Sequence, residues 1–213
     1  MTNSEASGGG DDEPKPGATA EVADAELMLR VQRDDEAALG TLMVRWELPV
    51  KAVIGRIVLN AREAEELAQE AFVRVWQQRT KFRAGAEFRP WVFAIAVNLA
   101  RNRLRWWRRR PEVALEEWTE LPGDAEGAGA AGPGKGGSAA LESAERAAAV
   151  RDAVAALPPE LREAIVLFEY EHMSHAEIGA TLGCTSKAVE ARLYRAREKL
   201  RTSLRRWVSA SPL

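Results

Sequence analysis

The chain has 213 residues, of which 29% are charged, and a formal net charge of −2. Its single cysteine, Cys184, excludes an intramolecular disulfide and favours a reducing compartment. A run of about 18 apolar residues, which a membrane span would need, does not occur. The polar N-terminus has no apolar core, so no signal peptide is expected.

Charge is distributed along the chain in blocks of opposite sign. Residues 1–24 hold six acids against one lysine, whereas Arg101 to Arg110 holds six arginines and no acid. Residues 111–145 hold eight acids against one lysine, and Lys187 to Arg206 holds eight bases against two acids. Such blocks indicate basic faces that meet a polyanion, or else ordinary solvated helix faces.

Composition and hydrophobic periodicity predict an all-α protein of two small helical domains joined by a flexible linker. Runs of alternating β-branched residues, which would indicate strands, do not occur. The Gly-rich N-terminal tail has almost no large apolar side chain and is expected to be disordered, and the linker is acidic and rich in Gly and Ala. The predicted segments are a tail (1–23), a first module (24–110), a linker (111–140), a second module (141–208) and a short C-terminal tail (209–213).

The first module should contain several amphipathic helices. Apolar residues from Leu39 to Trp46 follow helical spacing, Asp34 or Asp35 is a suitable N-cap, and Pro49 is expected to kink or break this helix. The next helix should begin near Arg62, with a polar face that runs from Glu63 to Gln77. Pro90 suits the first turn of a further helix, from about Phe88 to Arg108.

The second module carries the strongest local signal, a helix-turn-helix. Ser174 and Glu177 form a capping box that opens a short helix, and Gly183 suits the left-handed residue at its end. Thr185 or Ser186 can cap a long basic helix from Lys187 to Trp207. Such a helix can lie in the major groove of DNA, with residues near its N-terminus at the base edges; the alternative is a basic helix that packs on protein.

Other motifs carry less information. Arg101 to Arg110, with Trp106 and Trp107, has the cations and aromatic faces that bind single-stranded nucleic acid, although an Arg-rich helix end is also favoured by the helix dipole. His172, His175 and Cys184 have no obvious fourth partner for a metal site. No catalytic motif is found, so the sequence predicts no enzyme, no cofactor and no metal.

Three stretches together resemble the extracytoplasmic-function (ECF) group of the sigma-70 factors, which keep only the second and fourth conserved sigma regions. EAEELAQEAFVRVWQQ resembles the helix that docks on the polymerase clamp, and KFRAGAEFRPWVFAIAVNLARNRLR resembles the segment that melts and reads the −10 element. The stretch from ALPPELREAIVLFEYEHMSHAEIGATLGC to AVEARLYRAREKLR resembles the region that reads the −35 element. Order and spacing make the combination more specific than any one motif.

The resemblance implies three sets of site residues. Core polymerase would be bound by Glu66, Gln69, Glu70 and Arg74. The melted −10 strand would be bound by Phe82, Arg83, Phe88, Asn98, Arg101, Asn102 and Arg105. The −35 duplex would be bound by Lys187, Glu190, Ala191, Arg192, Tyr194, Arg195 and Arg197. Four positions depart from common family residues and are expected to alter promoter preference: Val97, Asn102, Glu190 and Ala191.

The resemblance also implies partners and a location. These are bacterial core RNA polymerase, promoter DNA and an anti-sigma factor, in the cytoplasm and with no membrane contact of the chain itself; the acidic linker would pass near the polymerase channel. Two other interpretations of the residues stay open at this point. One is a polymerase-independent regulator that uses the same helix-turn-helix, and the other is a helical adaptor whose basic helices bind acidic proteins.

Overall fold

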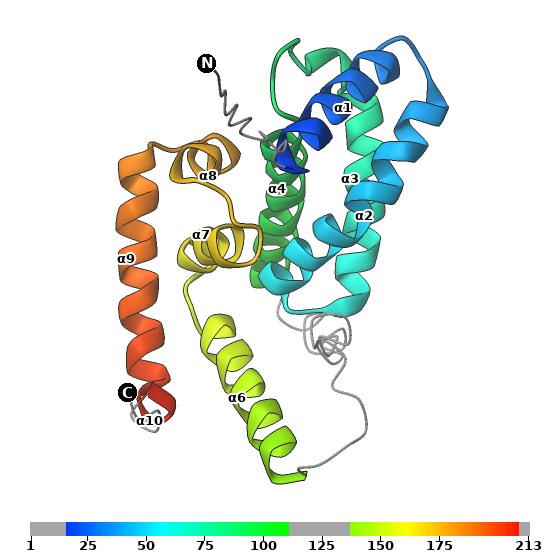
Figure 1. Cartoon of the computed structure of the whole chain (residues 1–213). Helices are drawn as coiled ribbons and strands as arrows, with labels where there is room; N and C mark the ends of the chain where they lie inside the picture. The colour runs from blue at the N-terminus through cyan, green and yellow to red at the C-terminus, as the bar shows by residue number, and fades with distance from the viewer. Residues whose placement is uncertain (1–15, 111–136, 209–213) are drawn as a thin grey trace, which may run out of the picture.

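The computed structural model describes residues 16–110 and 137–208, and every regular element in those ranges is helical (Figure 1). This confirms the predicted all-α class. The first module comprises α1 (Pro16–Val31), α2 (Glu36–Val58), α3 (Ala61–Gln77), the short 3₁₀ helix η1 (Arg79–Lys81) and α4 (Phe88–Arg109). The second comprises α6 (Gly137–Ala155), α7 (Pro159–Glu169), α8 (His175–Leu182), α9 (Ser186–Ser203) and α10 (Arg205–Val208).

Side-chain caps fix several helix ends. The Asp35 carboxylate accepts a hydrogen bond from the Ala38 N–H at 3.0 Å and caps α2, as the sequence predicted for this residue or its neighbour. Asn60 caps α3 in the same way, accepting from the Glu63 N–H at 3.0 Å. These bonds satisfy backbone N–H groups that have no partner within the helix. The helix starts are therefore set by local sequence.

Three boundaries differ from the sequence prediction. Helix α1 begins at Pro16, within the tail predicted to be disordered, and α6 begins at Gly137, within the predicted linker. Residues 1–15, 111–136 and 209–213 lie outside the described residues. The long basic helix α9 ends at Ser203 rather than at Trp207, and α10 follows it.

Pro49 does not end its helix, because α2 continues through it to Val58. A proline inside a helix removes one backbone hydrogen bond and costs about 3 kcal/mol. Val50, Val53, Ile54 and Ile57, which follow it, are all fully buried. Burying apolar side chains of this size stabilises a fold by about 1.5–3 kcal/mol each, which outweighs the cost of the proline.

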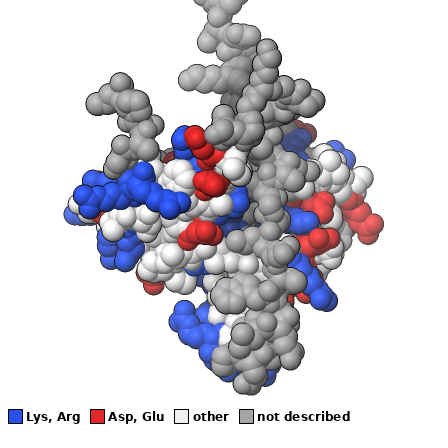
Figure 2. All heavy atoms as spheres, turned by 90° about the horizontal axis from the view of Figure 1, so that it is seen from below, with Lys and Arg blue, Asp and Glu red and all other residues white. Residues whose placement is uncertain are grey.

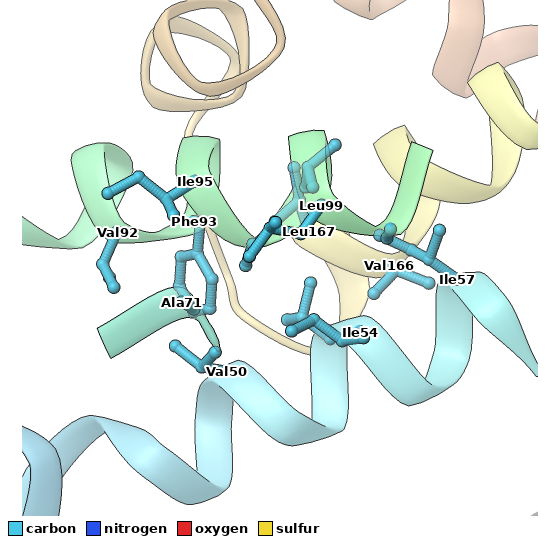
Figure 3. Packing of buried hydrophobic residues seen from close by; sticks show 14 of the residues in the cluster. Val50, Ile54, Ile57, Ala71, Val92, Phe93, Ile95, Leu99, Val166 and Leu167 are labelled. Atoms are coloured by element: carbon cyan, nitrogen blue, oxygen red, sulfur yellow. The ribbon is translucent and has the colours of Figure 1, made fainter. Parts of the chain in front are cut away.

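Helix α4 lies at the centre of the molecule, with α1, α2 and α3 on one side and α7, α8 and α9 on the other (Figure 1). The buried side chains form one continuous cluster that extends through both modules. Val166 and Leu167 of α7 point toward Ile54 and Ile57 of α2 and toward Leu99 of α4 (Figure 3). The two sequence modules therefore share a core. Among the described helices, none is long and apolar enough to cross a bilayer.

Candidate nucleic-acid and polymerase interfaces

The residues expected to bind polymerase lie on one outer face of α3. Glu66, Gln69 and Arg74 are exposed and Glu70 is half-buried, whereas the opposite face of the helix packs into the core. Arg74 donates to Glu70 at 2.8 Å, an i,i+4 ion pair on the surface. Exposed pairs of this kind are worth about 0.3–0.5 kcal/mol. The face is therefore free to exchange these contacts for those of a partner.

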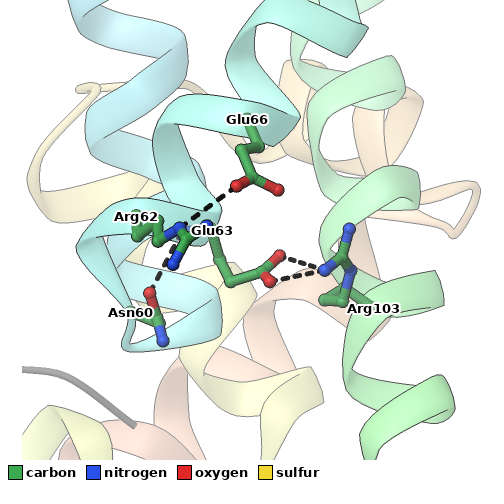
Figure 4. Close-up of polar contacts among 5 residues, drawn as sticks. All are labelled: Asn60, Arg62, Glu63, Glu66 and Arg103. Carbon is green, nitrogen blue, oxygen red and sulfur yellow. Dashed lines mark hydrogen bonds and ion pairs between the residues drawn. The ribbon is translucent and has the colours of Figure 1, made fainter. Parts of the chain in front are cut away.

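Glu63 does not belong to this polar face, which corrects the sequence interpretation. Its side chain is only 7% exposed and pairs with Arg103 of α4 at 2.5 Å (Figure 4). The pair joins the first turn of α3 to the second half of α4. It therefore fixes the position of α3 relative to the basic helix α4. Periodicity does not reveal this contact, because 40 residues separate the partners.

The residues expected to read the −10 strand divide into two groups. Asn98, Asn102 and Arg105 form an exposed stripe along α4 at i, i+4 and i+7, and Arg105 donates to Asn102. Arg83 is exposed in the loop before α4, where Gly85 adopts a left-handed conformation with φ of 79°. These four polar side chains are available to DNA.

Phe82 and Phe88, by contrast, lie in the core and are 3% and 2% exposed. The Phe82 ring meets Trp91 edge-on at 5.3 Å, and the Phe88 ring meets Trp46 at 5.9 Å. Both rings therefore support the loop from below and do not face solvent in this arrangement. The half-buried Trp91 joins the same packing.

Gln32, directly after the end of α1, holds this loop in place, a contact that the sequence did not indicate. Its amide donates to the carbonyl of Phe82 at 2.6 Å and to that of Arg79 at 2.9 Å. A nearby pair fixes α1 itself: the buried Asp24 carboxylate accepts from the Trp46 indole at 2.9 Å. The loop that carries Arg83 is thereby anchored from beneath.

Arg101 differs from its neighbours on α4. Its guanidinium makes two parallel hydrogen bonds to the Glu163 carboxylate of α7, at 2.8 and 2.6 Å. The bonds to Glu163 raise the pKa of Arg101 above its usual value, against the effect of burial. The side chain that was expected to contact DNA is therefore occupied by the chain's own second module.

The helix-turn-helix forms as the sequence predicted. Ser174 accepts from the Glu177 N–H at 3.2 Å, and the Glu177 carboxylate accepts from the Ser174 N–H at 2.7 Å. Gly183 ends α8 with φ of 67°. Thr185 then caps α9 by accepting from the Ala188 N–H at 3.2 Å. A tight turn thus sets the long basic helix against the short one.

The N-terminal half of α9 presents a polar face to solvent. Val189, Leu193 and Ala196 are buried on the opposite face of this helix. The outer face carries Lys187, Glu190, Ala191, Tyr194 and Arg195, all exposed.

Two arginines of α9 have additional contacts. Arg197 pairs with Glu169 at 3.1 Å and lies over the Phe168 ring at 4.8 Å, and Arg192 is half-buried. Viewed from below, Lys and Arg side chains crowd the side of the molecule on which α9 and α10 lie (Figure 2). On the opposite side, where α2 and α3 lie, acidic and basic side chains are mixed (Figure 2). The charge asymmetry favours α9 as a DNA-binding surface.

The described part of the chain contains no group of three His, Cys, Asp or Glu side chains that could hold a metal ion. His175 packs beside the Phe168 ring at 5.6 Å, and His172 is exposed at a turn with φ of 50°. Cys184 is half-buried in the turn between α8 and α9.

Comparison with known proteins gives a consistent result. The family model described as Sigma-70 region 2 matches residues 42–110, and the one described as Sigma-70, region 4 matches residues 147–200. The chain is 32% identical to the RNA polymerase sigma-H factor of Pseudomonas aeruginosa, over 85% of this chain and 93% of that protein. It is also 32% identical to the ECF RNA polymerase sigma-E factor of Escherichia coli K12, over 84% of this chain and 93% of that protein.

Solved structures show the same similarity. CnrH in complex with the cytosolic domain of CnrY aligns with a TM-score of 0.62 and 25% identity, over 89% of this chain and 99% of that one. The sigma factor RpoE in complex with the anti-sigma factor NepR from Bartonella quintana aligns with a TM-score of 0.58 and 22% identity. That alignment covers 78% of this chain and 96% of the other, and it supports the fold.

Proposed function

Because the chain belongs to the sigma-70 family and is one of its ECF sigma factors, we propose that its two modules divide the reading of a promoter between them. The protein directs core RNA polymerase to promoters and is not itself an enzyme. Its partners are core polymerase, promoter DNA and an anti-sigma factor. Since bacterial transcription takes place in the cytoplasm, we place the protein there.

The −35 element is read by the first turns of α9. Lys187, Glu190 and Arg195 are exposed on one side of a helix whose other side is buried. An arginine can make two hydrogen bonds to guanine, and a glutamate can accept one from the amino group of cytosine. The neighbouring Arg192 and Arg197 flank this face and suit phosphates, which position the helix without specifying sequence.

The melted −10 strand is held by the exposed stripe of α4 and by the loop that precedes it. Asn98 and Asn102 offer amide donors and acceptors that can replace the pairing partner of an unstacked base. Arg83, Arg101 and Arg105 supply positive charge for the backbone of the strand. Phe82 and Phe88 act as the buried support of this loop.

Core polymerase is bound by the outer face of α3, which carries Glu66, Gln69, Glu70 and Arg74. Val73, on the same exposed side, is 53% exposed and adds an apolar contact to this polar face. A helix face with both features suits a protein partner, because the apolar contact contributes affinity and the charged pairs set the orientation.

The single observation that carries this proposal is a helix-turn-helix and a basic α4 that coincide with the two matched sigma regions. The test is transcription by core polymerase and this protein on a pool of genomic promoters, with transcript starts sequenced. Specific starts that share a −35 and a −10 sequence are expected. If core binding is confirmed and no specific starts appear, the proposal is wrong.

Two variants and one control variant refine this test. Glu190→Ala should relax the preference at one −35 base pair, at a cost of about 1–3 kcal/mol of discrimination, whereas Glu198→Ala, further along α9, should leave the preference unchanged. Asn98→Ala should reduce open-complex formation more than it reduces binding to duplex DNA. Equal losses in both assays would argue against a base-binding role for Asn98.

A further inference from the structure

The two modules meet along a specific polar and apolar interface. Thr181 of α8, which is 4% exposed, donates to the carbonyl of Pro90 in α4 at 3.3 Å. Arg162 of α7 is 7% exposed and donates to the carbonyl of Ile57 at 2.8 Å, at the end of α2. Each of these bonds joins partners that are about a hundred residues apart in sequence. The contact therefore exists only when the second module folds back onto the first.

The pair formed by Arg101 and Glu163 is a two-bond ion pair between the modules. The Glu163 side chain is 2% exposed, and both of its oxygens are bound by the same guanidinium. A buried carboxylate that loses its cation destabilises the fold, so the packed arrangement strongly favours the pairing of Glu163 with Arg101. A phosphate offers a guanidinium the same two-oxygen geometry as a carboxylate does. The Arg101 guanidinium can therefore bind either the Glu163 carboxylate or a DNA phosphate.

The packed arrangement cannot span a whole promoter. Helix α9 packs on α8, which in turn packs on α4. Neighbouring helices lie about 8–10 Å apart, which places α9 within roughly 20 Å of α4. The −35 and −10 elements are about 25 base pairs apart, or roughly 85 Å at 3.4 Å per base pair. The modules must therefore separate before both elements can be read at once.

We propose that Arg101 has two alternative partners, Glu163 of the chain's own second module and a phosphate of the −10 strand, so that opening of the modules and capture of that strand are coupled. This proposal rests on the assignment of α4 to the −10 strand. In the arrangement with the two modules packed together, which we call the closed state, the polymerase-binding face of α3 remains accessible, and so does the stripe of Asn98, Asn102 and Arg105. The closed protein thus lacks one DNA contact and the reach to span a promoter.

The first experiment measures opening without DNA. Spin labels are placed at two exposed positions, by Val44→Cys on α2 and Thr202→Cys on α9, in the full chain with Cys184→Ser. We expect one short distance for this background and a longer, broader distribution after Glu163→Gln. The matched control is Glu169→Gln on the same helix, which removes the pair with Arg197 inside the second module. The control should keep the short distance.

The second experiment measures DNA binding by the free full chain, with a short fluorescent single-stranded DNA of random sequence. Glu163→Gln should bind about tenfold more tightly, because Arg101 no longer has to leave a charged partner. Glu169→Gln should change this affinity by less than about twofold. In an Arg101→Gln background, the further change Glu163→Gln should have no effect on affinity.

A charge exchange excludes simple misfolding as the explanation. Arg101→Glu alone should open the chain, and adding Glu163→Arg should restore the short distance but not the DNA affinity. If Glu163→Gln leaves both distance and affinity unchanged, the modules are not held by this pair and the inference is wrong. If the chain opens but the affinity does not rise, Arg101 does not bind DNA and the coupling is wrong. Specific transcript starts from the promoter pool would still support the proposed function in either case.

Discussion

Gly179 of the helix-turn-helix has no room for a side chain. It lies in the middle of α8, and a Cβ atom built at this residue would stand 2.7 Å from the backbone carbonyl oxygen of Cys184. That oxygen belongs to the turn into α9, and the Cys184 N–H in turn donates to the Gly179 carbonyl at 2.9 Å. Because the obstacle is backbone, no side-chain rotation can relieve the clash.

The change Gly179→Ala therefore sets two effects against each other. Alanine favours a helix over glycine by about 0.5–1 kcal/mol. Forcing an extra methyl group into a packed site costs about 1–3 kcal/mol. We expect a net loss of about 1–2 kcal/mol in the free energy of unfolding, together with weaker binding to −35 duplex DNA, since the turn that positions α9 must move.

Gly40→Ala is the matched control, because this helical glycine of α2 has no neighbouring atom within 4 Å of the added Cβ. It should raise the free energy of unfolding by up to about 1 kcal/mol. Both variants are measured by urea unfolding followed through tryptophan fluorescence, and by titration with promoter duplex. The reasoning is refuted if Gly179→Ala is as stable as the unchanged chain and binds duplex equally well.

Three further predictions concern pH and capping, each measured by the urea midpoint. Burial raises the pKa of Glu171 above its usual 4.5, although nearby Arg89 and Arg56 act to lower it. The folded state therefore holds this proton more tightly than the unfolded state does, and stability falls as pH rises through the range above 4.5. Glu171→Gln should flatten that pH dependence and raise the urea midpoint at pH 7, and an unchanged profile would contradict this. The hydrogen bond from the Ala38 N–H and, to a smaller extent, the bond from Arg30 lower the pKa of Asp35 below 3.8. The stabilisation by the Asp35 carboxylate is therefore present above that pH and is lost as pH falls through the folded-state pKa. Asp35→Ala should lower the urea midpoint at pH 7 but not near pH 2, and an equal loss at both pH values would exclude a charge effect. Thr185→Ala should cost about 0.5–2 kcal/mol through loss of the α9 cap, whereas Thr185→Ser should cost little.

Elements held by short-range contacts could be predicted from the sequence. The capping box of Ser174 and Glu177 joins residues three apart, and Gly183 supplies the left-handed residue that ends the same short helix. The span of α4 followed from an apolar periodicity that begins beside Pro90. In each case the pattern and the contact lie within the same few residues, so the residue types alone are sufficient.

Burial of polar and aromatic residues was harder to predict. Glu63 matched the polar face of α3 but pairs with Arg103 beneath it, and Phe82 resembled a base-contacting residue but packs in the core. Pro49 predicted a kink or a break, and α2 continues through it because the turns that follow are buried. Periodicity indicates which side of a helix is apolar, but it does not specify the element that covers a given residue.

The sequence by itself determined the all-α class, the cap of α2, the helix-turn-helix with its caps and the separation into two basic surfaces, because these depend on neighbours within one or two turns. Only the tertiary structure decided that the two modules share a core and that Arg101 of one is held by Glu163 of the other. A pair 62 residues apart leaves no local pattern. Whether a basic residue faces solvent, DNA or its own chain is set by how the helices pack. That packing depends on all the contacts of the interface together.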